Sequence, residues 1–287
     1  MDRDLAQRIG FAAAAIPFAL GIAWYGGWAM VAFLVVVAVL GTRELFQLFQ
    51  RSGGSALEAP GLIGAALLPP AVYLGLRDSG GPLARAAWPY LAALWLIAVL
   101  TVGLWRRSPE QRPLEAVATT VFGVAYAAAL PTFLLDLRHG SHEIRSWAGA
   151  WLVFFPLVVT WVCDTAAMFA GRAIGGPKLA PTVSPGKTQV GGVAGVIGGL
   201  LMAPLFHAVI FPRVGIVAPL GALLIIAGTL SIIGQVGDLA ESLFKRQAGV
   251  KDSSQLIPGH GGVLDRLDSL YFVIPTAAAL YRALGIQ

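Results

Sequence analysis

The sequence has few charged residues and almost no cysteine. Charged residues occupy 12% of the 287 positions, against roughly a quarter in soluble globular domains, whereas hydrophobic residues occupy 57%. Cys163 is the only cysteine, which excludes an intramolecular disulfide and a metal site built from several thiolates. So little charge in so apolar a chain is typical of an integral membrane protein that crosses the bilayer repeatedly.

The excess of basic residues does not indicate a nucleic-acid partner. The formal net charge is +5, but lysine and arginine are spread singly through the predicted loops, and no basic patch interleaved with aromatic residues is present. Basic loops beside a bilayer indicate orientation and contact with anionic membrane lipids instead.

Apolar runs long enough to cross a ~30 Å hydrocarbon core recur along the whole chain. They predict an all-α polytopic fold in a single integral membrane domain, 1–287, with nine transmembrane helices. The first span is interpreted as a retained anchor because no small-residue cleavage site follows it. The nine predicted spans are 9–25, 28–48, 60–76, 87–105, 114–135, 148–170, 190–211, 216–244 and 267–284.

Lysine and arginine are distributed unevenly between the two sides of this predicted topology. With a cytoplasmic N-terminus, fourteen of the 20 lie on the cytoplasmic side and six on the other side. Because positive residues are retained in cytoplasmic loops, the split favours a cytoplasmic N-terminus and an external C-terminus. The polar stretch Arg43 to Arg51, at the end of the second span, is expected to leave the bilayer as a helix.

Asp164 lies inside the predicted span 148–170, where an ionisable group costs about 3 kcal/mol unless it is paired or hydrated. One interpretation is a structural pair with Arg172, two helical turns later. The other, which we favour, is that Asp164 marks a cavity or a substrate pathway.

The loop that follows, 171–188, contains the parts of a phosphate-binding cradle. Its glycines allow close approach of backbone amides to an anion, Lys187 supplies a positive charge, and Ser184 and Thr188 supply hydroxyl donors. The spacing is not that of a Walker A motif, so a plain interhelical linker stays open as the alternative. Glycines then recur at small-residue spacing and predict close helix packing: Gly191, Gly192, Gly195, Gly198 and Gly199.

Charge is most concentrated between Asp238 and Asp268. At ~100° per residue, polar side chains of the helix that ends span 216–244 fall on one face, and Gly249 is expected to end that helix. These side chains are Asp238, Glu241, Ser242 and Lys245. A glycine-rich loop, 258–262, follows.

Asp265 and Asp268 stand three residues apart and are expected on one face of the helix that starts the last span. Asp238 and Asp265 can then converge to hold a hard cation such as Mg²⁺, which binds through one or two carboxylates and substrate phosphates. The alternative is a charge-balanced helical hairpin in which Asp252, Asp265 and Asp268 pair with Lys251 and Arg266.

This segment contains three runs of residues separated by fixed gaps. They are Ser242-Leu243-Phe244-Lys245-Arg246, Lys251-Asp252-Ser253-Ser254, and Pro258-Gly259-His260-Gly261-Gly262-Val263-Leu264-Asp265-Arg266-Leu267-Asp268. The pattern resembles the signature of the phosphatidate cytidylyltransferase (CDP-diacylglycerol synthase) family. The runs Asp164-Thr165, Gly171-Arg172, Lys178-Leu179-Ala180-Pro181 and Ser184-Pro185-Gly186-Lys187-Thr188 also resemble this family, so the likeness covers roughly the C-terminal half.

One departure from the family pattern follows Thr188. The family usually has a glutamate where this chain has Val190, between Gln189 and Gly191. The role of that glutamate is then absent here or is supplied by another residue, for which Glu241 is a hypothesis.

The resemblance implies the reaction of CTP with phosphatidic acid to give CDP-diacylglycerol and pyrophosphate at the cytoplasmic face of the cell membrane. Mg²⁺ is the implied cofactor, alone or with a second metal ion, and a homodimer is compatible with the small-residue faces. The stretch 1–145 would be a helical scaffold, and 146–287 the catalytic half, with cytoplasmic loops 171–189 and 245–266. The runners-up are a CTP-dependent transferase for another lipid phosphate and a secondary transporter of an anionic solute, although no internal repeat supports transport.

The resemblance also implies roles for individual residues. The catalytic residues would be Asp238, Lys251, Asp252 and Asp265, of which Asp238 and Asp265 would hold the metal. The substrate-binding residues would be Asp164, Arg172, Ser184, Lys187, Thr188, Ser242, Lys245, Arg246, His260, Gly261, Gly262, Arg266 and Asp268.

Overall fold

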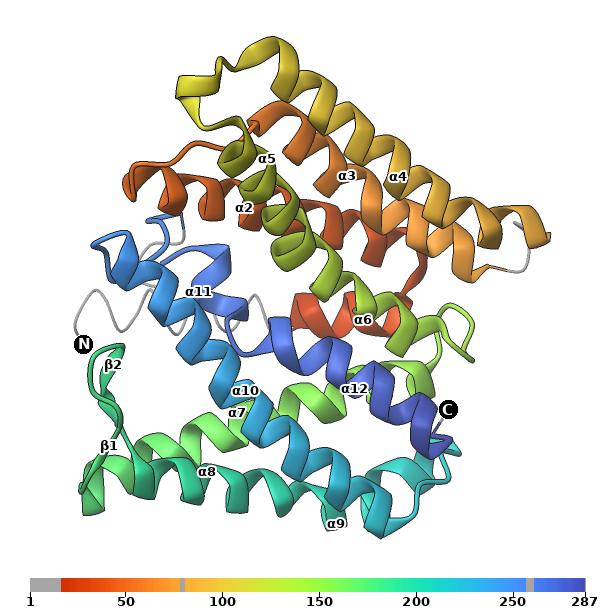
Figure 1. Cartoon of the computed structure of the whole chain (residues 1–287). Helices are drawn as coiled ribbons and strands as arrows, with labels where there is room; N and C mark the ends of the chain where they lie inside the picture. Colours follow the sequence, from red (N-terminus) through yellow and green to blue (C-terminus); the bar gives the residue numbers. More distant parts are fainter. Residues whose placement is uncertain (1–16, 78–80, 257–260, 287) are drawn as a thin grey trace. The chain divides into compact units, whose positions relative to one another are not determined.

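The computed structural model describes residues 17–77, 81–256 and 261–286, and most of the regular structure is helical (Figure 1). The α-helices after the helical stretch 17–25 are α2 (Gly27–Arg51), α3 (Glu58–Leu76), α4 (Gly81–Arg106), α5 (Pro113–Val124), α6 (Leu130–His139), α7 (Trp147–Ile174), α8 (Gln189–Leu200), α9 (Met202–Leu205), α10 (Leu220–Gln247), α11 (Val263–Leu267) and α12 (Leu270–Leu284). The shorter elements are the 3-10 helices η2 (Pro109–Gln111) and η5 (Phe211–Val214), the π-helical turns η3 (Ala125–Ala129) and η4 (Phe206–Ile210), and the strands β1 (Lys178–Ala180) and β2 (Ser184–Thr188).

Within residues 17–77, 81–256 and 261–286, seven helical segments are long and apolar enough to cross a membrane, and each overlaps one predicted span. They are Gly27–Arg51, Glu58–Leu76, Pro89–Arg106, Pro113–His139, Trp147–Ile174, Gln189–Val214 and Leu220–Gln247. Of the predicted span 9–25, only 17–25 lies among the described residues, and it is helical. The last predicted span corresponds to α12, whose 15 residues rise about 22 Å. The chain is therefore a helical, polytopic integral membrane protein.

Contacts divide the chain into two compact units. Unit 1 comprises Met1–Asp136 and Phe244–Arg266, and unit 2 comprises Leu137–Leu243 and Leu267–Gln287. The segment from Asp238 to Asp268, which we call the signature segment, is therefore divided between the units. Its residues 244–266 belong to unit 1, which contains the N-terminal helices, and the remainder belongs to unit 2.

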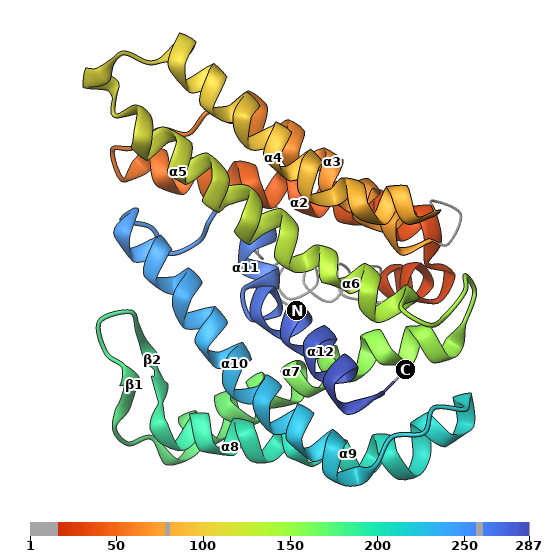
Figure 2. The ribbon, with the colours of Figure 1, turned by 45° about the vertical axis from the view of Figure 1, so that its right-hand side comes forward.

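In unit 1, α2 packs along α3, and α3 runs beside α4 in both views (Figures 1 and 2). The chain enters α2 through Gly26 and Gly27, whose φ angles of 67° and 56° are accessible to glycine with little strain. Residues 244–266, the second stretch of unit 1, are fixed at their start by aromatic packing. Phe244 packs edge to face on Phe122 and Tyr126, at 5.7 and 5.8 Å between ring centroids.

In unit 2, α8 lies directly against α7, and the close approach is made by the predicted glycine face. A Cβ on Gly195 would lie 2.9 Å from the Cys163 carbonyl oxygen, and one on Gly198 would lie 2.8 Å from the Ala166 Cβ. Only glycine fits at these positions, so the prediction of close helix packing is confirmed.

Two local expectations were wrong. The stretch 178–188, expected as a loop, forms an antiparallel hairpin in which Lys178 pairs with Thr188 and Ala180 with Ser184. The hairpin extends from the shared end of α7 and α8 (Figure 1). The helix expected to carry both Asp265 and Asp268 is interrupted, because α11 ends at Leu267 and α12 begins only at Leu270.

Candidate active site

A buried ion pair lies at the centre of the signature segment in unit 1. Lys245, in the last turn of α10, donates from Nζ to Oδ1 of Asp265 on α11 at 2.7 Å. The two side chains are 10% and 5% exposed. The partner of Asp265 is therefore Lys245, and not Lys251 or Arg266, which are both exposed. This excludes the charge-balanced hairpin as far as Asp265 is concerned.

The second oxygen of Asp265 is held by three donors. Oδ2 accepts hydrogen bonds from the Ser253 amide at 2.8 Å, the Ser253 hydroxyl at 2.7 Å and the Gly262 amide at 2.8 Å. Burial raises the pKa of this carboxyl, but the hydrogen bonds from Gly262, Lys245 and Ser253 outweigh it and hold the pKa below its ordinary value. Asp265 is therefore an ionised, tightly oriented carboxylate.

Glu44, which the sequence analysis did not select, joins this arrangement from α2. It is only 4% exposed. Oε1 accepts from the Ser254 hydroxyl and the Val263 amide, and Oε2 accepts from the Leu264 amide, at 2.7–3.0 Å. The Ser253 hydroxyl has one proton and lies 3.0 Å from Oε2, so Glu44 and Asp265 share that proton. We call Glu44, Lys245, Ser253 and Asp265 the Asp265 cluster.

The expectation that Arg43 to Arg51 is helical is confirmed, since α2 continues to Arg51, but one face of this stretch is buried in the protein. Glu44, Leu45, Phe46 and Leu48 are all buried within α2. The only sign of Glu44 in the sequence is a carboxylate directly after a long apolar run, a position compatible with the cytoplasm as well as with a protein interior.

Four charged signature residues of unit 1 lie on its surface. Arg246, Lys251, Asp252 and Arg266 are exposed, and Arg246 Nη1 donates to the Val250 carbonyl at 3.1 Å. The predicted site residue His260 lies outside the described residues. Gly261 has a φ of 79°, which favours glycine, and Gly262 is buried against Glu44 and Ser253.

Unit 2 contains a second cluster of predicted residues. Lys187 Nζ forms an ion pair with Asp238 Oδ2, and the Ser242 hydroxyl donates to Asp238 Oδ1 at 3.3 Å. Asp164 is exposed on α7, near enough to Asp238 and Lys187 for their charges to interact with it. We call Asp164, Lys187, Asp238 and Ser242 the Asp238 cluster.

The hairpin provides one member of this cluster and fixes its position. Thr188 is buried and accepts a hydrogen bond from the Gly191 amide at 3.1 Å, so it caps α8 at the residue that follows Lys187. Ser184, at the other end of β2, is half-buried opposite Ala180.

The remaining predicted residues of unit 2 lie outside the Asp238 cluster. Arg172 is exposed, and among the described residues no ion pair joins it to Asp164. Asp268 accepts a hydrogen bond from the Ser269 amide at 2.6 Å. Glu241, the hypothetical substitute for the family glutamate, is completely buried on α10.

The described part of the chain contains no group of three or more His, Cys, Asp or Glu side chains able to hold a metal. Asp238 and Asp265, each taken by itself, offer the oxygen donors that suit a Mg²⁺ ion with few protein ligands and several from substrate phosphates. From the described residues, each Asp238 oxygen accepts one hydrogen bond, as does Oδ1 of Asp265, and a carboxylate oxygen has two lone-pair sites. These oxygens retain capacity for a cation, whereas Oδ2 of Asp265 is already saturated.

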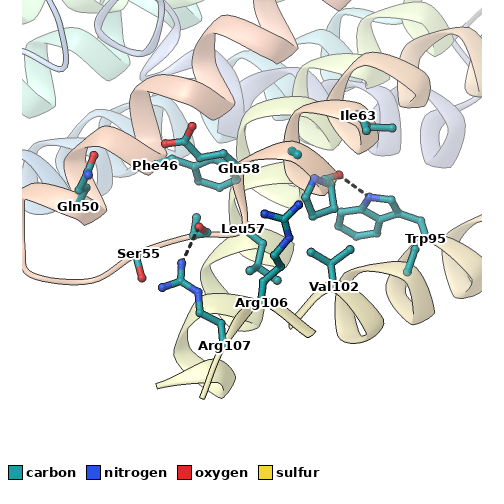
Figure 3. Close-up of a pocket in the computed structure, with 14 residues that line it drawn as sticks. Phe46, Gln50, Ser55, Leu57, Glu58, Ile63, Trp95, Val102, Arg106 and Arg107 are labelled. Atoms are coloured by element: carbon teal, nitrogen blue, oxygen red, sulfur yellow. Dashed lines mark hydrogen bonds between the residues drawn. The ribbon is translucent and has the colours of Figure 1, made fainter. Parts of the chain in front are cut away.

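Unit 1 also contains a cavity of about 710 Å³ between α3 and α4 (Figure 3). Its apolar lining includes Ile63, Trp95 and Val102, and Trp95 Nε1 donates to the Pro60 carbonyl at 2.9 Å. Arg106 and Arg107 extend toward it from the end of α4. None of the predicted site residues that the structure describes lines this cavity.

Comparisons with known proteins agree with the signature. A model of the cytidylyltransferase family matches residues 6–284. The phosphatidate cytidylyltransferase of Haemophilus influenzae is 40% identical over 197 residues, covering 68% of this chain and 66% of that protein. The phosphatidate cytidylyltransferase of Bacillus subtilis is 32% identical over 247 residues, covering 85% of this chain and 86% of that protein. That of Brucella suis is 45% identical over 161 residues, covering 54% and 53%.

The agreement extends well beyond the motif that suggested the family. The family model matches the N-terminal helices as well, and the Bacillus subtilis relative is similar along most of both chains. The resemblance seen in the signature is confirmed: the chain belongs to the cytidylyltransferase family and is a nucleotidyltransferase.

Proposed function

We propose that the chain transfers the cytidylyl group of CTP to phosphatidic acid, forming CDP-diacylglycerol and releasing pyrophosphate. The names of its relatives identify phosphatidate as their acceptor. The structural observation that carries the proposal is the buried Lys245–Asp265 pair, around which the family signature folds.

The chemistry requires charge neutralisation and alignment. An oxygen of the lipid phosphate attacks the α-phosphorus of CTP, a new P–O bond forms, and the bond between the α-phosphorus and the bridging oxygen breaks, so that pyrophosphate leaves. The attacking phosphate is already an anion and needs no general base. Fixed positive charges and backbone amides that meet the growing negative charge are therefore the main requirement.

The signature residues are assigned by where the structure places them. Arg246, Lys251 and Arg266 are exposed and are proposed to meet substrate phosphates. Lys245, buried against Asp265, is proposed to add positive charge while it holds that carboxylate. Asp252 is proposed to orient Lys251, and His260, Gly261 and Gly262 are proposed to shape the pyrophosphate site.

The residues of unit 2 are assigned to the nucleotide and its surroundings. Ser184, Lys187 and Thr188 on β2 are proposed to contact the CTP phosphates. The other assigned positions are Asp164, Arg172, Ser242 and Asp268, as substrate-binding residues.

Asp238 and Asp265 are proposed to hold Mg²⁺, alone or with a second metal ion. When bound, the ion would neutralise charge on the phosphates of CTP and on the departing pyrophosphate. Asp238 would be released from Lys187 for this purpose, leaving the lysine close to the same phosphates.

The proposed location is the cell membrane, with the active site facing the cytoplasm. The proposed topology has nine spans, a cytoplasmic N-terminus and an external C-terminus, supported by the 14-to-6 distribution of basic residues and by seven helical segments long enough to span. The glycine face of α8 is occupied by α7 within the chain, so a homodimer would need another surface.

An assay with purified protein, labelled CTP, Mg²⁺ and phosphatidic acid tests the proposed function. We expect lipid-soluble cytidine label and one pyrophosphate released for each label transferred. A parallel reaction with a polyprenyl phosphate separates the closest alternative, a CTP-dependent transferase for another lipid phosphate. Product only from that second acceptor, or no product together with solute flux in liposomes, would refute the proposal.

A further inference from the structure

Glu44 connects α2 to a segment more than 200 residues away in the sequence. Its partners Ser253 and Leu264 lie 209 and 220 positions further along the chain. The two sides of the signature loop, 251–256 and 261–265, each place two donor groups at the Glu44 carboxylate, of which the Ser253 hydroxyl is shared with Asp265. One buried carboxylate therefore binds both sides of the loop at once.

These contacts explain how a carboxylate can be buried at this position. Ionised groups are removed from water at a high cost, which is offset only where several donors surround them. Oε1 of Glu44 accepts one hydroxyl and one backbone amide, and Oε2 accepts one backbone amide and shares the Ser253 hydroxyl proton with Asp265. Both amides belong to the first turn of α11, where they have no partner within the helix. The site is thus complementary to a carboxylate and not merely to a polar side chain.

The Glu44 contacts continue directly to Asp265. The Ser253 hydroxyl lies 3.0 Å from Glu44 Oε2 and 2.7 Å from Asp265 Oδ2. Gly262, whose amide donates to Asp265, is packed so closely on the Glu44 carboxylate that a Cβ there would collide with it. A change in Glu44 must therefore displace groups that orient Asp265.

We propose that Glu44 is a positioning residue for the transfer reaction. It keeps the two sides of the signature loop together, and through Ser253 and Gly262 it holds the Asp265 carboxylate in one orientation. Glu44 itself touches neither substrate. The inference deepens the proposed function and rests on it for its kinetic consequence, whereas the structural link between α2 and the loop does not depend on the reaction.

Glu44→Gln tests the inference with a nearly isosteric change, because the amide nitrogen of Gln cannot accept the hydrogen bonds that one carboxylate oxygen receives. We expect kcat to fall by about 10- to 100-fold, the range associated with a small misplacement of a reacting group, while KM for CTP and for phosphatidic acid changes little. Hydrogen exchange should accelerate in peptides covering 251–256 and 261–267 and remain unchanged in α7 and α8.

Glu58→Gln is the matched control, since Glu58 is an exposed glutamate at the start of α3 in the same unit. It should leave kcat and hydrogen exchange unchanged. If Glu44→Gln lowers thermal stability but leaves kcat per folded molecule and loop protection at wild-type values, the residue is only structural and the inference is overturned.

Ser254→Ala decides the question if Glu44→Gln does not fold, because it removes a single donor to Glu44. We expect a fall in kcat of several-fold and faster exchange confined to the same peptides, and unchanged values of both would overturn the inference. Absence of product from the wild-type protein would refute the proposed function instead, and the exchange measurement would still decide whether Glu44 holds the loop.

Discussion

The Lys245–Asp265 pair leads to a quantitative prediction about stability. Asp265→Asn can keep an oxygen toward Ser253 and Gly262, but its amide group then faces the Lys245 ammonium, donor against donor. Removing one partner of a buried ion pair costs about 3–5 kcal/mol. We expect Asp265→Asn to lower the free energy of unfolding by this amount and to abolish turnover.

Lys245→Met should cost less, about 1.5–3 kcal/mol, because Asp265 keeps the three donors to Oδ2 and loses one charge-assisted hydrogen bond. The double variant removes both charges, so its loss should be smaller than the sum of the two single losses by about 1.5 kcal/mol or more. At roughly 2–4 °C per kcal/mol, Asp265→Asn should reduce Tm by about 6–20 °C.

Thermal unfolding of the four proteins in one detergent measures these differences, with CTP turnover of the folded fraction recorded below the lowest Tm. The Lys187–Asp238 pair is the matched comparison, because its side chains are 28% and 24% exposed. Additive losses, within about 0.5 kcal/mol for the double variant, would show that Lys245 and Asp265 do not act as a pair and would refute the reasoning.

Three further predictions follow from single contacts. Asp238→Asn should abolish turnover yet cost about 1 kcal/mol or less, because its pair with Lys187 is partly exposed; a Tm loss as large as that of Asp265→Asn would contradict this. Gly262→Ala should cost about 1–3 kcal/mol by overpacking against Glu44, and wild-type stability in the same unfolding assay would disprove the close contact. The pKa of His142 is lowered by burial and by the Arg138 charge, against the opposing effect of a backbone hydrogen bond with Ser141. The free energy of unfolding should therefore be full above pH 6.5 and decrease as the pH falls through the lowered pKa. His142→Gln should flatten the slope of Tm against pH.

The seven spanning segments and the family were determined by the sequence alone. Long apolar runs such as 148–170 and 190–211 have few stable locations other than a hydrocarbon core, and their lengths match its thickness. The glycine face of α8 was likewise readable, since small residues at helical spacing have close packing as their usual role. The signature was recognisable because its polar residues and glycines keep fixed gaps.

The hairpin and the break between α11 and α12 were decided by tertiary contacts. The stretch 178–188 is rich in proline and glycine and reads as a loop, but Thr188 is held at the start of α8 and the two arms pair from there. Asp265 and Asp268 have helical spacing in the sequence, yet α11 ends between them and their hydrogen-bond partners differ. Local periodicity contains no information about where such partners lie.

Glu44 marks the limit of what the sequence determined. A carboxylate at the end of an apolar run looks the same whether it enters the cytoplasm or the protein interior, and the choice depends on donors supplied from elsewhere. Those donors are the hydroxyls and amides of Ser253, Ser254, Val263 and Leu264, more than 200 positions away. Only the folded structure brings them to α2, because the cost of burying Glu44 is offset by groups that no local pattern connects to it.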